Sequence, residues 1–306
     1  MQNFSKPVAD IIRQRYSCRT YLEQPIEPDL RQQISGYIAG LGAGPFGGRA
    51  RFELIAAEEE DRKSLRRLGT YGFIKGATGF LVGVTADREQ KLEDFGWLME
   101  RLVLHVTDLG LGSCWLGGTF TRSSFAQKIS AQSNEFMPTV VSVGYIAPTP
   151  RAVERLIRRG GNFNRRLSHD RLFFAERFGA ALPLSEAGEY ALPLEMVRLA
   201  PSASNRQPWR IIRQADGWHF YLRRTPGYRE SKLNRLFAKA DLQRIDMGIA
   251  MCHFELTARE LGLQGEWSKD DPGLELPDEL TTYSATWVSS ELAQPDFSNT
   301  HESIHA

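Results

Sequence analysis

Gly96-Trp-Leu-Met-Glu-Arg-Leu-Val-Leu-His-Val-Thr-Asp-Leu-Gly-Leu-Gly-Ser-Cys-Trp115 returns, in altered form, as Gly248-Ile-Ala-Met-Cys-His-Phe-Glu-Leu-Thr-Ala-Arg-Glu-Leu-Gly-Leu-Gln-Gly-Glu-Trp267. The two segments lie 152 residues apart, about half the chain, and 7 of their 20 positions are identical. Both have the apolar spacing of a long core helix. Both end at Leu-Gly-Leu, where the glycine suits the left-handed position after a helix. The pattern predicts two copies of one structural unit.

A repeat of this length predicts two units packed about a pseudo-twofold axis, as in a homodimer. We therefore expect an α+β fold made of two α/β/α halves within one chain. The expected boundaries are 1–178 for the first half, 179–290 for the second and 291–306 for a disordered tail rich in Ser, Asn, His and Glu. The alternative is that two unrelated core helices share leucines and glycines by chance.

Composition limits the class of protein. The 306 residues are 42% apolar and 25% charged, which are globular values, and the net charge of +1 gives no general attraction to nucleic acid or anionic lipid. Three scattered cysteines form neither a disulfide framework nor a zinc site. No signal peptide or membrane-length apolar run is visible. We expect a cytoplasmic protein with no membrane or nucleic-acid partner.

Hydrophobic periodicity predicts the main elements. The expected strands include a fully apolar one at 80–85 and a clear one at 139–146. The expected helices are 7–16, 28–41, 95–109, 123–129, 190–199 and 243–261, and the expected strands are 52–57, 80–85, 139–146, 209–213, 218–223 and 282–288.

Three polar stretches carry the chemistry. The first, Ala200-Pro-Ser-Ala-Ser-Asn-Arg-Gln-Pro-Trp209, is a rigid loop of hydrogen-bonding groups suited to a flat, polar-edged heterocycle. The second, Arg15-Tyr-Ser-Cys-Arg19, places two guanidinium groups around a hydroxyl and suits a phosphate, with Arg165-Arg166 able to close over it. The alternative for these arginines is that they satisfy helix-end carbonyls or lie in water.

The third stretch is Leu109-Gly-Leu-Gly-Ser-Cys-Trp-Leu-Gly-Gly118. Its glycines allow backbone to approach a planar ligand, with N–H groups directed at an electron-rich atom. It is not a dinucleotide-binding fingerprint, because it follows a helix rather than a strand. A glycine-rich helix exit without a ligand stays an alternative.

Together these stretches resemble the nitroreductase superfamily of FMN-dependent flavoproteins, and more closely its double-length members, in which two units are fused. The resemblance also includes Gly144-Tyr145 and the segment Asp241–Phe254, and it covers roughly residues 8–290. It implies bound FMN, which carries the redox chemistry while the protein orients it, so no catalytic side chain is assigned. A metal is not expected either, because His301 and His305 lie in the tail without a third ligand.

The resemblance also implies roles for particular residues. The FMN phosphate and ribityl chain would be held by Arg15, Ser17, Arg19, Arg165 and Arg166. Lys75 would stand near the N1/O2 edge of the ring, although the asparagine usual in the family is missing before it. The backbone near the reactive N5 would come from Leu116, Gly117 and Gly118, and the second half would contribute Pro201, Ser202, Ser204 and Asn205.

Only one complete site is expected. The position of the polar loop in the first half is taken by Gly40–Arg49, which lacks its serines and asparagine, and Leu182–Leu194 in the second half offers no arginine for a phosphate. We expect one FMN per chain and a monomer, because the family's dimer interface is internal. The implied activity is reduction of a nitroaromatic, quinone or similar small acceptor by NAD(P)H. The alternatives are a non-catalytic flavin-binding descendant and other flavin-dependent dehydrogenation chemistry.

Overall fold

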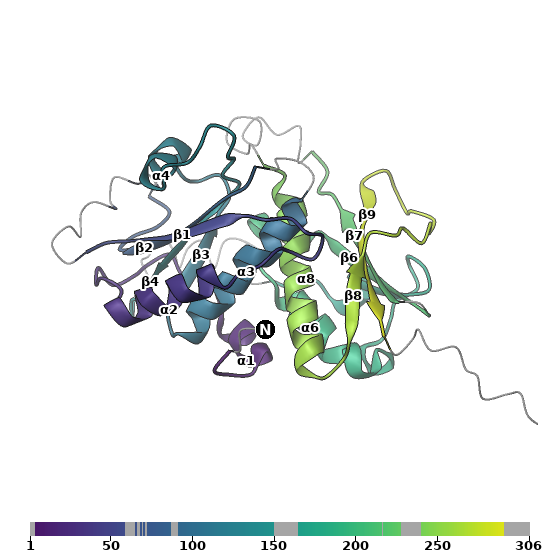
Figure 1. Ribbon diagram of the computed structural model, residues 1–306. Helices are drawn as coiled ribbons and strands as arrows, with labels where there is room; N and C mark the ends of the chain where they lie inside the picture. Colours follow the sequence, from purple (N-terminus) through teal and green to yellow (C-terminus); the bar gives the residue numbers. More distant parts are fainter. Residues whose placement is uncertain are drawn as a thin grey trace, which may run out of the picture.

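Two long helices cross at the centre of the molecule, with one β-sheet on either side (Figure 1). They are α3 (Leu92–Asp108) and α8 (Leu242–Glu260), the two helices of the sequence repeat. The computed structural model describes residues 4–58, 65, 68, 70, 72–86, 91–149, 165–215, 217–227 and 240–290. The predicted tail at 291–306 lies outside these residues. No helix in the described part is long and apolar enough to cross a membrane.

The first sheet has the strand order β1-β2-β4-β3, and every neighbouring pair is antiparallel. Helices α2 and α3 lie on one side of it, and α4 lies at its far end (Figure 1). The elements of this half are α1 (Val8–Gln14), α2 (Pro28–Ala39), β1 (Arg51–Ala56), β2 (Gly79–Val84), α3, β3 (Gly112–Leu116), α4 (Arg122–Lys128) and β4 (Val140–Gly144).

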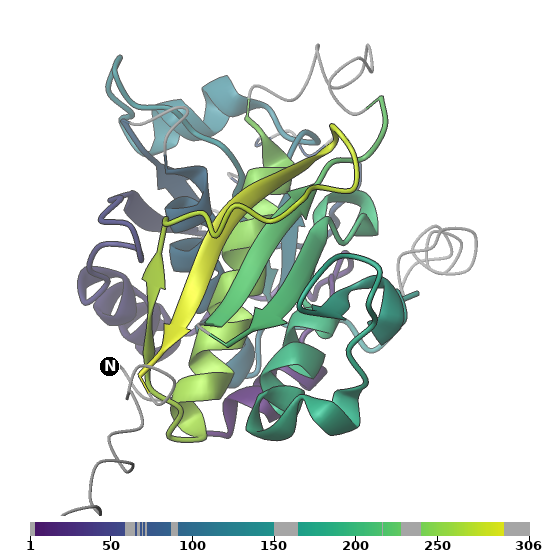
Figure 2. The same ribbon diagram turned by 90° about the vertical axis from the view of Figure 1, so that its right-hand side faces the viewer.

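The second sheet repeats this topology as β6-β7-β9-β8, again with antiparallel neighbours (Figure 2). Its elements are β5 (Phe173–Ala175), α6 (Ala191–Leu199), β6 (Trp209–Gln214), β7 (Gly217–Arg223), α8, β8 (Gly265–Ser268) and β9 (Thr281–Ser289), with short 3-10 turns at 169–171, 184–186, 188–190 and 203–205. The order α2-β1-β2-α3-β3-β4 therefore recurs as α6-β6-β7-α8-β8-β9, and the duplicated α+β fold is confirmed.

One strand breaks this correspondence. β5 adds to the second sheet by parallel pairing with β6, in register Phe173 with Ile211. It precedes residue 178, the predicted end of the first half, yet lies in the sheet of the second. The chain thus ties the halves together through the sheet as well as through the helices.

Gly96 and Gly248 explain why the two long helices can cross so closely. A Cβ atom on Gly96 would overlap the carbonyl oxygen of Ile245, and one on Gly248 would overlap that of Glu93. Positions 93 and 245 are separated by the same 152 residues as the glycines, so the contact is reciprocal, as at a twofold interface. The glycine pair of the repeat is required by backbone packing.

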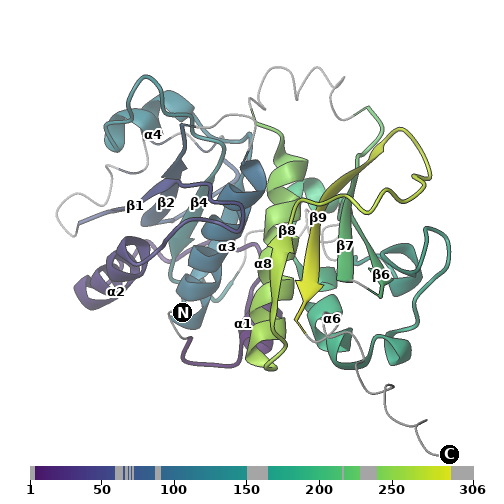
Figure 3. The ribbon, with the colours of Figure 1, turned by 45° about the vertical axis from the view of Figure 1, so that its right-hand side comes forward.

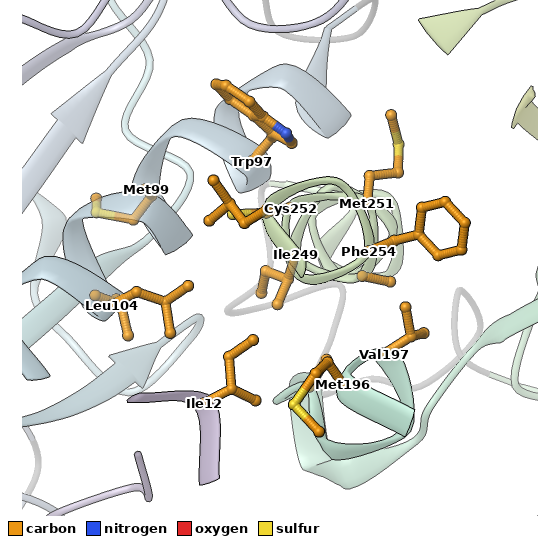
Figure 4. Close-up of a cluster of buried hydrophobic side chains, with 14 of the residues drawn as sticks. Ile12, Trp97, Met99, Leu104, Met196, Val197, Ile249, Met251, Cys252 and Phe254 are labelled. Atoms are coloured by element: carbon orange, nitrogen blue, oxygen red, sulfur yellow. The ribbon is translucent and has the colours of Figure 1, made fainter. Parts of the chain in front are cut away.

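One of the hydrophobic clusters extends across both halves. Figure 4 shows Met99 and Leu104 from α3 facing Ile249 and Cys252 from α8. Helix α1 lies beneath both long helices and contacts α3, α6 and α8, so it belongs to the junction between the halves (Figure 3). This position places the end of α1, where the arginine motif begins, against residues of the second half.

The predicted helices and strands are present, with ends that differ by at most three residues. The glycine stretch is different from the expectation, because Gly112–Leu116 forms strand β3 and pairs with β4. Non-local pairing supplies its backbone partners, and the missing side chain of Gly112 makes room for Ile146, whose Cγ1 would lie 2.8 Å from a Cβ there. Periodicity within this short segment could not show that pairing.

Candidate functional site

The arginine motif, residues 15–19, follows α1 and continues as a segment that hydrogen-bonds to other parts of the first half. Arg15 ends α1, donating its N–H to the carbonyl of Ile11 at 2.9 Å. Beyond it, the Cys18 N–H donates to the Ser113 carbonyl of β3 at 2.9 Å, and the Lys75 N–H donates to the Arg19 carbonyl at 3.0 Å. These hydrogen bonds place the arginine motif beside β3, and Gly117 and Gly118 directly follow that strand.

The charges of two arginines, Arg15 and Arg166, interact at the junction of the halves. The Arg15 side chain is buried, with 9% of the residue exposed, and its Nε has no hydrogen-bond partner among the described residues. Burial lowers its pKa, while the charge of Glu100 opposes that shift. Burial, the charge of Arg15 and then that of Arg198 lower the pKa of Arg166 to about 10. The structure thus gathers two cations that repel each other in a place where water screens them poorly.

Arg166 also joins this cluster to the polar loop of the second half. Its Nη1 donates to Oδ1 of Asn205, and its Nη2 donates to the Leu199 carbonyl at 2.8 Å. In return, the Asn205 amide donates to the Arg165 carbonyl at 2.8 Å, and so does that of Gln207 at 3.1 Å. Arg166 and Asn205, predicted to bind the cofactor from different halves, are in direct contact with each other.

The loop itself has an unusual backbone. Ser204, Asn205 and Gln207 have φ angles of 51°, 54° and 50°, a left-handed conformation that residues other than glycine adopt at a cost. Hydrogen bonds hold it, including one from the Gln207 N–H to Ser202 Oγ at 2.9 Å. Backbone of this kind clusters at ligand sites, where the surrounding structure over-determines it.

The glycines after β3 lie at the other side of the junction. A Cβ on Gly117 would be 2.6 Å from Cδ1 of Leu242, the first residue of α8, so the two halves approach closely here and a larger residue would displace the Leu242 side chain. Leu116 is buried in the core on the outer face of the first sheet, and Gly118 is half-buried.

Lys75 stands apart from the paired arginines. It is exposed, and among the described residues no hydrogen bond or ion pair joins it to Arg15, Arg166 or Asn205. It lies on a pocket of about 310 Å³ with an apolar floor that includes Ile74 and Phe80. The placement of Lys75 beside a ring therefore stays a prediction.

Sequence reasoning missed two buried acidic residues, Glu100 at the junction of the halves and Asp246 beneath the polar loop of the second half. Glu100 accepts from Trp115 Nε1 at 2.8 Å and contacts His253 Nε2 at 2.9 Å, with both side chains of the Glu100–His253 pair fully buried. Asp246 accepts the Ala203 N–H of the polar loop at 2.9 Å. Asp94 is the residue of the first half that corresponds to Asp246, at the same offset of 152. Extending the sequence repeat by two residues toward its start would have revealed these two matching aspartates.

Asp94 holds the loop of the first half that takes the place of the polar loop. It accepts the N–H groups of Phe46 at 2.9 Å and Gly48 at 2.6 Å. A Cβ on Gly44 would lie 2.6 Å from Cβ of Asp94, so this glycine-rich loop lies directly on the carboxyl group. Lys269 Nζ is 4.1 Å from the centre of the Phe46 ring.

A family model and a solved structure each match most of the chain. The family model described as "Putative TM nitroreductase" matches residues 7–258. The crystal structure of a nitroreductase described as putative, from Thermotoga maritima, has 19% identity and a TM-score of 0.56 and covers 94% of this chain and 96% of its own. That similarity confirms the fold. No curated protein is significantly similar to this chain.

Two shorter solved chains show lower TM-scores. A nitroreductase family protein from Clostridium difficile 630 has 20% identity and a TM-score of 0.38 and covers 49% of this chain and 91% of its own. A nitroreductase with bound FMN from Desulfitobacterium hafniense has 20% identity and a TM-score of 0.38 and covers 49% of this chain and 93% of its own. From the family match, which spans more than half of the sequence, the chain belongs to the nitroreductase family described as "Putative TM nitroreductase".

Proposed function

We propose that the protein is an FMN-dependent oxidoreductase that accepts reducing equivalents from NAD(P)H and passes them to a nitroaromatic, a quinone or a similar small acceptor. Family membership and the bound FMN of a distant relative support the cofactor class. The observation that carries the proposal is the Arg15–Arg166 pair, in which one buried guanidinium retains an unpartnered Nε. A dianion would stabilise a buried cation, Arg15, and a half-buried one, Arg166, that repel each other, and the FMN phosphate is a dianion.

In this assignment both halves hold the cofactor. Arg15, Ser17, Arg19, Arg165 and Arg166 bind the phosphate and ribityl end. Arg166 also fixes Asn205, so phosphate binding and the conformation of the loop are mechanically linked. The loop then orients the ring from the second half through Pro201, Ser202, Ser204 and Asn205.

The first half would supply the remaining contacts. Leu116, Gly117 and Gly118 present backbone N–H groups, and Lys75 provides a positive charge that stabilises developing negative charge in a site of low dielectric constant. FMN, when bound, supplies the hydride-accepting chemistry, and the chain binds it, orients it and limits access of water. The family's dimer interface is internal here, so we propose a monomer.

The test is purification, an absorbance scan across the flavin bands and anaerobic addition of NADH and, separately, NADPH. Bleaching of the bound flavin by either nucleotide, followed by recovery on adding a quinone or nitroaromatic, is expected. A protein that neither contains nor binds FMN would overturn the proposal. Bound FMN that is reduced no faster than free FMN would instead favour the non-catalytic descendant.

A further inference from the structure

Asp246 is a buried acid directly beneath the polar loop of the second half. Its Oδ1 accepts the Ala203 N–H at 2.9 Å, whereas its Oδ2 is buried and has no hydrogen-bond partner among the described residues. Only 3% of the residue is exposed. A buried carboxylate oxygen without a donor is costly, because ionised groups need hydrogen bonds or a counter-ion once water is removed.

Asp94 shows how the same position looks when both oxygens are satisfied. Its Oδ1 and Oδ2 each accept a backbone N–H, from Phe46 and Gly48, and the positive charge of Lys269 adds to these. Burial raises the pKa of Asp94, but the two N–H donors oppose that shift. The two acids therefore occupy equivalent positions, but both carboxyl oxygens of Asp94 accept a hydrogen bond and only Oδ1 of Asp246 does so among the described residues.

The charged groups around Asp246 do not compensate its charge. Asp241, at the start of the same helix, is paired with Arg224, while Arg244 is paired with Glu93 of α3. Arg206 of the loop is exposed, and Arg198 of the neighbouring helix α6 is paired with Glu195. Burial raises the pKa of Asp246 well above its ordinary value, and the negative Asp241 adds to this, against the Ala203 hydrogen bond.

We propose that Asp246 is a positioning residue that holds the loop 200–207 for the flavin in its protonated form. As a neutral acid it keeps the Ala203 bond through Oδ1 and carries a hydroxyl on Oδ2. Ionisation would favour a second backbone N–H donor, as at Asp94, and would draw the loop away from its left-handed conformation. The positioning role depends on the proposed FMN site, whereas the protonation of Asp246 does not.

The first experiment detects the proton directly. The infrared difference spectrum between wild type and Asp246→Asn at pH 7, without flavin, is expected to contain the C=O stretch of a protonated carboxyl in the wild type only. The matched difference for Asp94→Asn provides the comparison at the equivalent position. Absence of that band from the wild-type minus Asp246→Asn spectrum would overturn the proposal even if the protein binds no FMN.

The second experiment measures positioning by FMN titration with fluorescence detection. Asp246→Asn, which resembles a neutral acid, should stay within about 3-fold of the wild-type dissociation constant, whereas Asp246→Ala, which loses the Ala203 bond, should weaken binding about 5- to 10-fold. Asp94→Asn should leave FMN affinity unchanged. Equal losses in Asp246→Asn and Asp246→Ala would contradict the protonated form, and no loss in Asp246→Ala would contradict the positioning role. If the wild type fails to bind FMN, the proposed function fails instead.

Discussion

The loop 200–207 of the second half and the loop 40–49 of the first occupy the same place in the duplicated fold. Each loop connects a helix to a strand: α2 to β1 in the first half and α6 to β6 in the second. Each also donates backbone N–H groups to an aspartate near the start of a long helix, Asp94 of α3 or Asp246 of α8. The loop 200–207 has hydroxyl and amide side chains on a left-handed backbone. The loop 40–49 has glycines that lie on Asp94. One scaffold thus supports a ligand-type loop and a packed loop.

The two halves also differ opposite these loops. The offset of 152 aligns Lys269 with Gly117, so a long side chain stands where the first half has none. Lys269 lies against Phe46 and donates to the Ser284 carbonyl at 2.7 Å. Protein side chains therefore take up space in this half-site, which supports the proposal of a single flavin per chain.

The largest expected effect concerns the close crossing of α3 and α8, which joins the two halves. Gly248→Ala would force α3 and α8 apart, because the new Cβ overlaps the carbonyl oxygen of Glu93. We expect the free energy of unfolding to fall by about 3 kcal/mol, the upper end of overpacking costs, and Gly96→Ala to behave similarly. Denaturant titration measures both.

Gly36→Ala is the matched control. Gly36 lies in α2 with nothing within 4 Å of the new Cβ. Helix propensity predicts a gain of about 0.5–1 kcal/mol there. A Gly248→Ala variant as stable as wild type would show that the two helices do not cross in backbone contact.

The phosphate cluster gives the next effect. Arg15→Met removes a charge-assisted fork while keeping an apolar stem, and should weaken FMN binding by roughly 10- to 100-fold, since such bonds contribute about 1.5–3 kcal/mol. Arg49→Met, in the packed loop, is the exposed control and should change nothing. Equal losses from both changes would mean that the arginine motif is not the phosphate site.

The next prediction concerns the number of FMN molecules that bind to each chain. Titrating flavin-free protein with FMN should saturate at about one equivalent per chain, because Phe46 and Lys269 fill the second half-site. Equilibrium dialysis of wild type measures this directly. Two tightly bound equivalents would show that the packed loop still serves a ligand.

The smallest expected effect distinguishes the loops themselves. Asn205→Ala removes the bonds to Arg166 and to the Arg165 carbonyl, and should weaken FMN binding about 5-fold and shift the flavin absorbance. Phe46→Ala, in the matching loop, should alter neither property. An effect of Phe46→Ala on the flavin spectrum, with none from Asn205→Ala, would reverse our assignment of the two loops.

Much of the fold could be read from local patterns. The helices at 92–108 and 242–260 and the apolar strands at 79–84 and 140–144 have periodicities that do not depend on their partners. The short strands β3, β5 and β8 were not predicted, because three to five residues carry too little pattern and their stability comes from pairing with distant strands. The arginine motif and the polar loop were found because rare residue combinations stand out.

The sequence by itself determined the duplication, the family resemblance and the unequal loops, because each is written in contiguous residues. The tertiary structure decided which groups meet: Arg15 with Arg166, Arg166 with Asn205 and Asp246 with the backbone of Ala203. It also decided the direction of their pKa shifts, since burial is the largest cause of each shift and burial is a property of the whole packing. The residue types of a motif indicate its chemistry from the sequence alone. The contacts between distant side chains and their removal from water arise only when distant segments pack together.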